Sequence, residues 1–179
     1  MRRTLIAVTV LLAVGMAATA AQAASPHFKK NGEPVCTITG TATSKTVQCR
    51  GTLAGLGGGD LAIPTTVSGS AVYQCRNAGG NIAPGQNRVL VGPSTVPTTI
   101  GSQSIKNGSV TFTTNANTLT APTTVSGADA GCPNPNWTGV NPTLTLTDIS
   151  LTISQGGVLL FTCTASNPAG LTSPVSLSC

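Results

Sequence analysis

Charged side chains are scarce in this sequence of 179 residues, where they occupy 7% of the positions, against about a quarter in an average protein. The nine lysines and arginines are scattered and form no basic run. This distribution argues against recognition of nucleic acid or of an anionic membrane surface. Disorder is also disfavoured, because disordered segments combine low hydrophobicity with high net charge, whereas 40% of these residues are hydrophobic.

The side chains that usually carry catalysis are equally scarce. The one histidine is His27, in a segment expected to be mobile, so a Ser-His-Asp triad would lack a positioned base. Asp60 and Asp129, two of the four carboxylates, fall in glycine-rich loops, where aspartate commonly forms turns. The sequence therefore predicts a non-catalytic protein. A carboxylate-dependent glycan hydrolase remains an alternative, because glycosidases need only two such groups.

Patterns that hold metals or cofactors are missing. The cysteines include no C-x₂₋₄-C pair of the kind found in zinc sites, and no D-x-D-x-D-G calcium loop is present. The glycine-rich stretch at residues 53–60 (L-A-G-L-G-G-G-D) is followed by neither a lysine nor a helical pattern. A phosphate-binding loop requires that context. We therefore expect no metal and no cofactor.

The first 23 residues have the organisation of a secretory signal peptide. Arg2 and Arg3 precede an apolar stretch from Leu5 to Ala18, and residues 21–23 (A-Q-A) form a cleavage site. The sequence has no cysteine for lipidation at that site and no second long apolar segment. We therefore expect a secreted, extracellular protein without a membrane anchor.

All six cysteines follow this signal, and cysteines of exported proteins usually form disulfides. They are Cys36, Cys49, Cys75, Cys132, Cys163 and Cys179. A hairpin that turns at residues 42–43 would bring the first two face to face, and one centred on Leu171 would do the same for the last two. Elimination then pairs the middle two.

The residues after the signal predict an all-β fold. Threonine and valine favour strands, and hydrophobic residues alternate with polar ones along most of the chain. A slip in this alternation near Asp148 predicts either a β-bulge or a strand that changes sheets, and Asn107-Gly108 predicts a hairpin turn. The expected strands are 35–39, 47–51, 67–75, 88–91, 109–113, 144–153, 159–165 and 174–179.

The predicted domain organisation is simple. Residues 24–34 are expected to form a flexible arm, and residues 35–179 a single β-sandwich domain. Two segments dense in turn-forming residues, 77–87 and 129–141, are expected to be rigid loops at its ends.

Two short stretches resemble the F strand of immunoglobulin-type domains. Residues 161–170 (F-T-C-T-A-S-N-P-A-G) are similar to the Y-T-C-x-A-x-N-x-x-G pattern of I-set domains, with Phe161 in place of tyrosine. Residues 71–75 (A-V-Y-Q-C) resemble the end of the same strand type, which carries a tyrosine corner. The resemblance implies an antiparallel immunoglobulin-like β-sandwich.

The chain also resembles small exported bacterial proteins of unassigned function. The residues that carry this resemblance are 55–60, 75–87 and 130–137 (A-G-C-P-N-P-N-W). The composition is similar to that of secreted chromophore carriers of the neocarzinostatin type, which by analogy implies a ligand-binding cleft.

Stiff loops at the ends of a sandwich are where recognition is usually placed. The candidate binding residues in these loops are Asp60, Asp129, Asn134, Asn136 and Trp137. We therefore expect a structural or adhesion-type binding protein with an unknown extracellular partner. The alternatives are an extracellular carrier of a small apolar ligand, held between the sheets, and the glycan hydrolase considered above.

Overall fold

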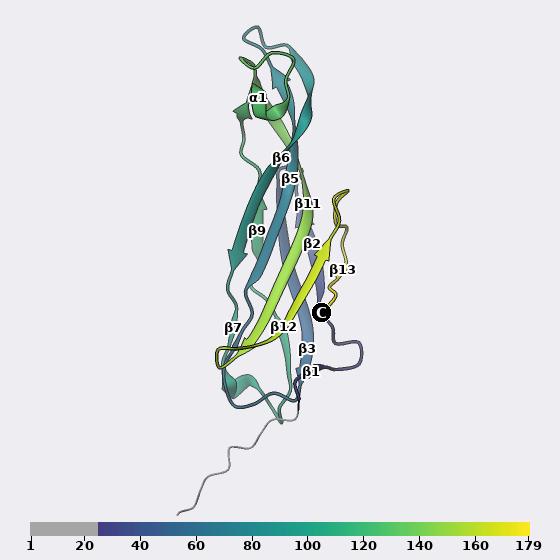
Figure 1. Cartoon of the computed structure of the whole chain (residues 1–179), viewed down its shortest axis with the longest axis vertical. Helices are drawn as coiled ribbons and strands as arrows, with labels where there is room; N and C mark the ends of the chain where they lie inside the picture. Colours follow the sequence, from purple (N-terminus) through teal and green to yellow (C-terminus); the bar gives the residue numbers. More distant parts are fainter. Residues whose placement is uncertain (1–24) are drawn as a thin grey trace, which may run out of the picture.

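The computed structural model describes residues 25–179, which form one elongated antiparallel β-sandwich (Figure 1). The expected signal peptide at residues 1–23 lies outside the described residues. Two sheets face each other and enclose a hydrophobic core. The all-β fold that the alternating pattern predicts is therefore confirmed.

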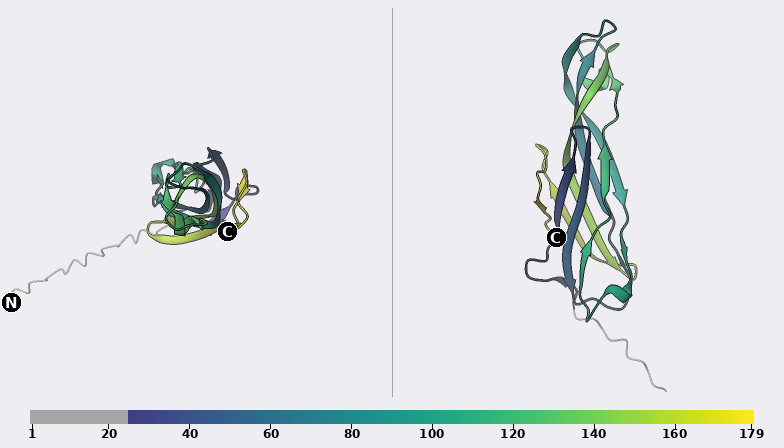
Figure 2. Two further views of the ribbon diagram at one scale, coloured as in Figure 1. Left: turned by 90° about the horizontal axis from the view of Figure 1, so that it is seen from above. Right: turned by 180° about the vertical axis from the view of Figure 1, so that it is seen from behind.

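The strands divide between the sheets as follows. The first, six-stranded sheet contains β1 (His27–Phe28), β2 (Val35–Gly40), β3 (Ser44–Ala54), β8 (Val110–Thr113), β9 (Asn117–Thr120) and β13 (Val175–Ser176). The second, seven-stranded sheet contains β4 (Leu61–Ala62), β5 (Thr65–Arg76), β6 (Ile82–Val96), β7 (Thr99–Ile100), β10 (Val125–Ser126), β11 (Thr138–Gln155) and β12 (Val158–Ser166). Figure 2 shows both sheets from behind and along the long axis.

Two short helical segments mark the ends of the molecule. Helix α1 (Gly127–Ala130) lies at one end of the long axis. The 3-10 segment η1 (Ser102–Ser104) follows β7 and lies at the other end (Figure 1).

The core follows from the two-residue period of a strand, in which successive side chains point to opposite faces. In β3, Val47 and Leu53 are fully buried, and in β5, Val67 and Tyr73 are buried in the same way. Polar residues alternate with them on the outer faces. The β-branched and aromatic residues that favour strands thus also supply the core.

The bulge predicted near Asp148 is confirmed in β11. The register between β11 and β5 shifts between Leu146 and Asp148, so that Thr147 is an extra residue. Leu146 and Ile149 are both buried, whereas the two residues between them line a cavity on the outer face. A bulge re-aims side chains in this way, and here it sets a carboxylate on the outer face of the second sheet.

All three predicted disulfide pairs are confirmed. The three bonds join Cys36 to Cys49, Cys75 to Cys132 and Cys163 to Cys179. The first crosses between facing positions of β2 and β3. The second ties β5 to the segment after α1, and the third ties β12 to the C-terminal residue. Three such bonds indicate an oxidising environment.

The rigid loop expected at residues 77–87 is shorter than predicted. Only residues 77–81 turn, because β6 begins at Ile82 and pairs with β5. Among the strands of residues 25–179, β6 is an edge strand of its sheet. An edge strand has no ladder on one side and therefore tolerates proline, here Pro84 and Pro93.

The second expected loop, residues 129–141, also differs from the prediction. Asp129 lies in helix α1, and β11 already begins at Thr138.

The positive φ of Asn107 and Gly108 bears out the turn predicted there. The arm expected to be flexible at residues 24–34 contains β1, whose residue Phe28 pairs with Leu53 of β3.

The C-terminal strand is the largest departure from the predicted pairing. It covers only Val175–Ser176 and pairs with β2 of the first sheet, not with β12. A single bridge between Thr164 and Ser178 remains from the expected hairpin. The register between β11 and β12 shifts beside the turn, and Leu159 at the start of β12 is 61% exposed.

Candidate functional site

Two adjoining cavities open along β6, and both are lined by Arg88 and Leu90. One, of about 300 Å³, lies on the outer face of the second sheet, and the other, of about 520 Å³, lies toward α1. We call the two together the β6 groove. Its lining residues are Ser70, Asn87, Arg88, Val89, Leu90, Ala128, Asp129, Thr147, Asp148, Ser166 and Pro168.

The bulge in β11 supplies one carboxylate of this groove. Ser166 Oγ donates a hydrogen bond to Asp148 Oδ1, and Thr147 Oγ1 donates one to Asp148 Oδ2, each at 2.6 Å. These bonds, that from Ser166 above all, hold the pKa of Asp148 below its ordinary value, although desolvation opposes them. The groove therefore contains a fixed anion at neutral pH.

Arg88 supplies the facing cation. It lies in β6 opposite Val72, and its side chain reaches across the sheet to donate a hydrogen bond to the carbonyl of Pro168, at 3.4 Å. A guanidinium carries five N–H donors in a planar fork. Because this one contact is long, most of the donors are available to a ligand in the groove.

A second carboxylate lies on the other side of Arg88, in α1. Ser126 caps this helix: its Oγ accepts a hydrogen bond from the Asp129 backbone N–H at 3.1 Å and donates one to Asp129 Oδ2 at 2.6 Å. The helix is attached to β6, because Asn87 Nδ2 donates to Ala128 O at 3.4 Å. Asp129 thus lines the groove, and Arg88 stands between two carboxylates.

Leu90 gives the groove its apolar character. Its side chain is 86% exposed, more than that of any other large hydrophobic residue in the described part of the chain. Pro168, on the loop after β12, lines the same cavity. Leu90 and Pro168 together form the apolar part of the groove lining.

Asp60, another of the candidate residues, lies far from this groove. Its Oδ1 accepts a hydrogen bond from the backbone N–H of Ser102 at 2.7 Å, which places it beside η1, whereas Asp129 lies in α1 at the opposite end of the molecule (Figure 1). The two carboxylates of a glycosidase lie within about 10 Å of each other. Asp60 and Asp129 therefore do not form such a pair.

The remaining candidates lie on one loop next to α1 but outside the groove lining. Asn134 Oδ1 accepts from the Asn136 backbone N–H at 2.9 Å, and Asn134 O accepts from the Trp137 N–H at 3.0 Å. Trp137 is half-buried and packs against the core. The carbonyl oxygens of this loop approach Gly127 so closely that a Cβ there would clash. These polar groups thus build the turn that supports α1.

Of the sequence-based candidates, only Asp129 reaches the groove. Sequence reasoning missed Arg88, Leu90 and Asp148, although two signals pointed to them. The slip of phase at Asp148 was interpreted only as a feature of the backbone, a bulge or a change of sheet. Arg88 and Leu90 are two residues apart in an expected strand, so the sequence already places them on one face.

The lowered pKa of Asp148 predicts an acid-sensitive contribution to stability, which Asp148→Asn should remove. A carboxyl whose pKa is lower in the folded chain favours folding when it is ionised. This contribution is complete above the pKa of the unfolded chain, about 3.9, and is lost as the pH falls through the lower, folded-state pKa. We expect the difference in unfolding free energy between wild type and variant to be constant at neutral pH and to shrink below about pH 4. Urea unfolding of wild type and variant at neutral pH and below about pH 4 measures this difference. A difference that does not change with pH would contradict the expectation.

The chain matches no protein-family model, and no curated protein matches it significantly. Within residues 25–179, no group of three His, Cys, Asp or Glu side chains could hold a metal ion. No helix in this described range is long and apolar enough to cross a membrane.

Proposed function

We propose that the protein is a secreted, non-catalytic, adhesion-type binding module, and that its β6 groove holds an extended segment of an extracellular partner protein. The observation that carries the proposal is the position of Arg88 and Leu90 on an edge strand, where both line one cavity with Asp148 and a second with Asp129. This arrangement offers an apolar contact and charges of both signs within one groove.

The edge position of β6 favours an extended peptide. A peptide can add a strand to a free sheet edge, where main-chain hydrogen bonds supply affinity and neighbouring side chains supply specificity. Helix α1 covers one part of this edge, since Gln86 N–H donates to Gly131 O at 3.3 Å. The segment from Arg88 to Val91 lies beyond that contact, beside both cavities.

A glycan is a poorer occupant of this groove. Sugar-binding sites usually present an aromatic face, and no aromatic residue is among the lining residues. Trp137 packs against the core instead. The charged side chains of the groove and the aliphatic side chain of Leu90 suit a peptide better than a glycan.

Secretion is part of the proposal and rests on the signal-like residues 1–23 together with the three disulfides. The immunoglobulin-like assignment stays a prediction. The hallmark disulfide of antibody domains joins strands of opposite sheets, whereas Cys163 bonds to the C-terminal Cys179. The hydroxyl of Tyr73 donates to Pro122 O at 2.9 Å, far along the chain and not within a tyrosine corner.

A second function, carriage of a small apolar ligand, is favoured by one separate observation. A cleft of about 320 Å³ lies between the two sheets, and half of its eight lining residues are aliphatic. Its ligand class is considered in the next subsection.

Binding to the cell-surface proteins of the source organism tests the proposed function. The disulfide-bonded protein is immobilised for biolayer interferometry, and the surface fraction is applied before and after protease treatment. We expect binding that protease abolishes. Arg88→Ala and Leu90→Asp should each weaken it about tenfold or more, because truncation of central interface residues commonly costs over 1.4 kcal/mol.

Leu159→Asp is the matched control for this experiment. Leu159 is 61% exposed, so the substitution should not disturb the core, and it lies beside the β11–β12 turn, away from α1 (Figure 1). Its binding should equal that of wild type. Binding that survives both groove substitutions would refute the groove as the site, and binding removed by glycosidase but not by protease would refute a protein partner.

A further inference from the structure

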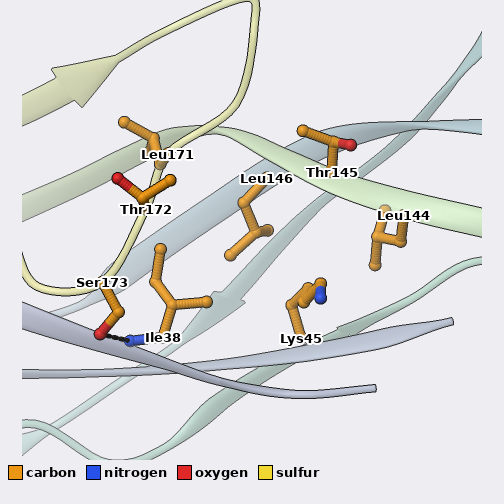
Figure 3. A pocket seen from close by; sticks show the side chains of 8 residues that line it. All are labelled: Ile38, Lys45, Leu144, Thr145, Leu146, Leu171, Thr172 and Ser173. Atoms are coloured by element: carbon orange, nitrogen blue, oxygen red, sulfur yellow. Dashed lines mark hydrogen bonds between the residues drawn. The ribbon is translucent and has the colours of Figure 1, made fainter. Parts of the chain in front are cut away.

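The cleft between the sheets shares no lining residue with the β6 groove. Figure 3 shows the side chains that line it. Four aliphatic side chains line it: Ile38 of β2, Leu144 and Leu146 of β11, and Leu171 of the C-terminal segment. Lys45 of β3 and three polar residues, Thr145, Thr172 and Ser173, complete the lining. With a volume of about 320 Å³, the cleft is at the small end of the range for ligand pockets, about 300–1,000 Å³.

Hydrogen bonds between distant segments hold the walls of the cleft in place. Leu144 N–H donates to Ala42 O at 2.7 Å and attaches the β2–β3 turn to β11. Leu171 N–H donates to Leu146 O at 2.8 Å and attaches the C-terminal segment to the same strand. Ile38 N–H donates to Ser173 Oγ at 3.0 Å (Figure 3). The cleft therefore exists before any ligand binds.

Lys45 is unusual because its position in β3 belongs to the inward face. It shares the parity of Val47 and Cys49, which are both fully buried, and Lys45 itself is half-buried. None of the four carboxylates of the chain lines the cleft. A lysine in such a position packs its aliphatic stem against apolar neighbours and keeps its ammonium group available to an anion at the mouth of the cleft.

We propose that the cleft binds a small amphipathic carboxylate, such as a medium-chain fatty acid. The aliphatic chain lies against Ile38 and Leu171, the partly exposed aliphatic residues of the lining, where water is displaced from apolar surface. The carboxylate accepts a charge-assisted hydrogen bond from Lys45 Nζ. The inference deepens the carrier function named above and does not depend on the β6 groove.

Titration with octanoate tests this site, with octanol as the neutral analogue. Calorimetry and amide chemical shifts are recorded on the protein purified with its three disulfides formed. We expect octanoate to bind and to shift the amide signals of Ile38, Leu146 and Leu171. Lys45→Met should weaken octanoate about tenfold or more, as expected for loss of a charge-assisted hydrogen bond, and should leave the affinity for octanol within about twofold, because Met retains the aliphatic stem.

Three further variants separate the outcomes. Lys45→Arg should retain octanoate binding, and Lys106→Met, which removes an exposed lysine, should not change it. Arg88→Ala should also leave it unchanged, so that failure of the cleft and failure of the groove are distinguishable. Absence of octanoate binding, shifts confined to other residues, or equal affinity of wild type and Lys45→Met would each overturn the proposal.

Discussion

Removal of the disulfide between Cys75 and Cys132, by replacing both cysteines with alanine, is expected to lower the free energy of unfolding by about 4 kcal/mol. This bond closes a segment of 57 residues, whereas the other two close segments of 13 and 16 residues. In the chain-entropy model, a longer closed loop restricts the unfolded chain more strongly. The three closed segments follow one another along the sequence without overlap, so each bond restricts its own stretch of unfolded chain.

The double alanine variant of Cys36 and Cys49 is the matched control. Both of these cysteines are fully buried, as Cys75 is, but the shorter loop predicts a loss of about 3 kcal/mol. Urea unfolding followed by circular dichroism and by the fluorescence of Trp137, the single tryptophan, measures both losses. Coincident curves from the two probes would support two-state unfolding. A larger loss for the 36–49 pair would show that loop length does not rank these bonds.

Asn117→Ala is the second substitution with a large expected effect, about 3 kcal/mol of destabilisation. Asn117 lies in β9 of the first sheet and is fully buried. Its Nδ2 donates to Thr65 O at 2.7 Å and to Ser94 O at 2.9 Å, and its Oδ1 accepts from Ser94 Oγ at 2.9 Å. One amide thus joins β9 to both β5 and β6 of the other sheet. Without it, buried carbonyl groups lose their donors, at a cost of about 1 to 3 kcal/mol each.

Asn115→Ala controls for the residue type and the region. Asn115 is exposed, and its Nδ2 donates to Pro97 O at 2.8 Å, so water can replace the lost bond. We expect a cost of about 1 kcal/mol or less. The midpoint of urea unfolding compares the two variants. Equal midpoints would mean that the amide of Asn117 does not hold the sheets together.

The groove shows why a site on a sandwich is hard to predict from sequence. Arg88, Asp129 and Asp148 come from β6, α1 and β11, and each was visible as a separate residue. Alternation indicates which face of a strand a side chain occupies, but not which strand lies beside it. The sequence-based candidates were chosen from loops and included Asp60 and the turn at residues 134–137. The polar groups at these positions form hydrogen bonds with backbone N–H groups. The functional candidates instead lie on strands and on a short helix.

The local features of this protein could be predicted from short stretches of its sequence. The hairpin that sets Cys36 opposite Cys49, the turn at Asn107-Gly108 and the bulge at Asp148 all depend on residues close together in the chain. Short-range turn chemistry and the two-residue period specify such features without knowledge of the rest of the fold.

Tertiary structure decided the choice of partners. The C-terminal strand could pair with β12, its neighbour in sequence, or with β2, and it pairs with β2. The sequence alone does not distinguish Lys45 from an ordinary surface lysine. In the folded chain, β11 and the C-terminal segment line the same cleft as Lys45. Strands with similar alternation could pair with one another in several ways, and the packing of the whole core selects one set of strand pairings. Only that set brings Arg88, Asp129 and Asp148 into one groove.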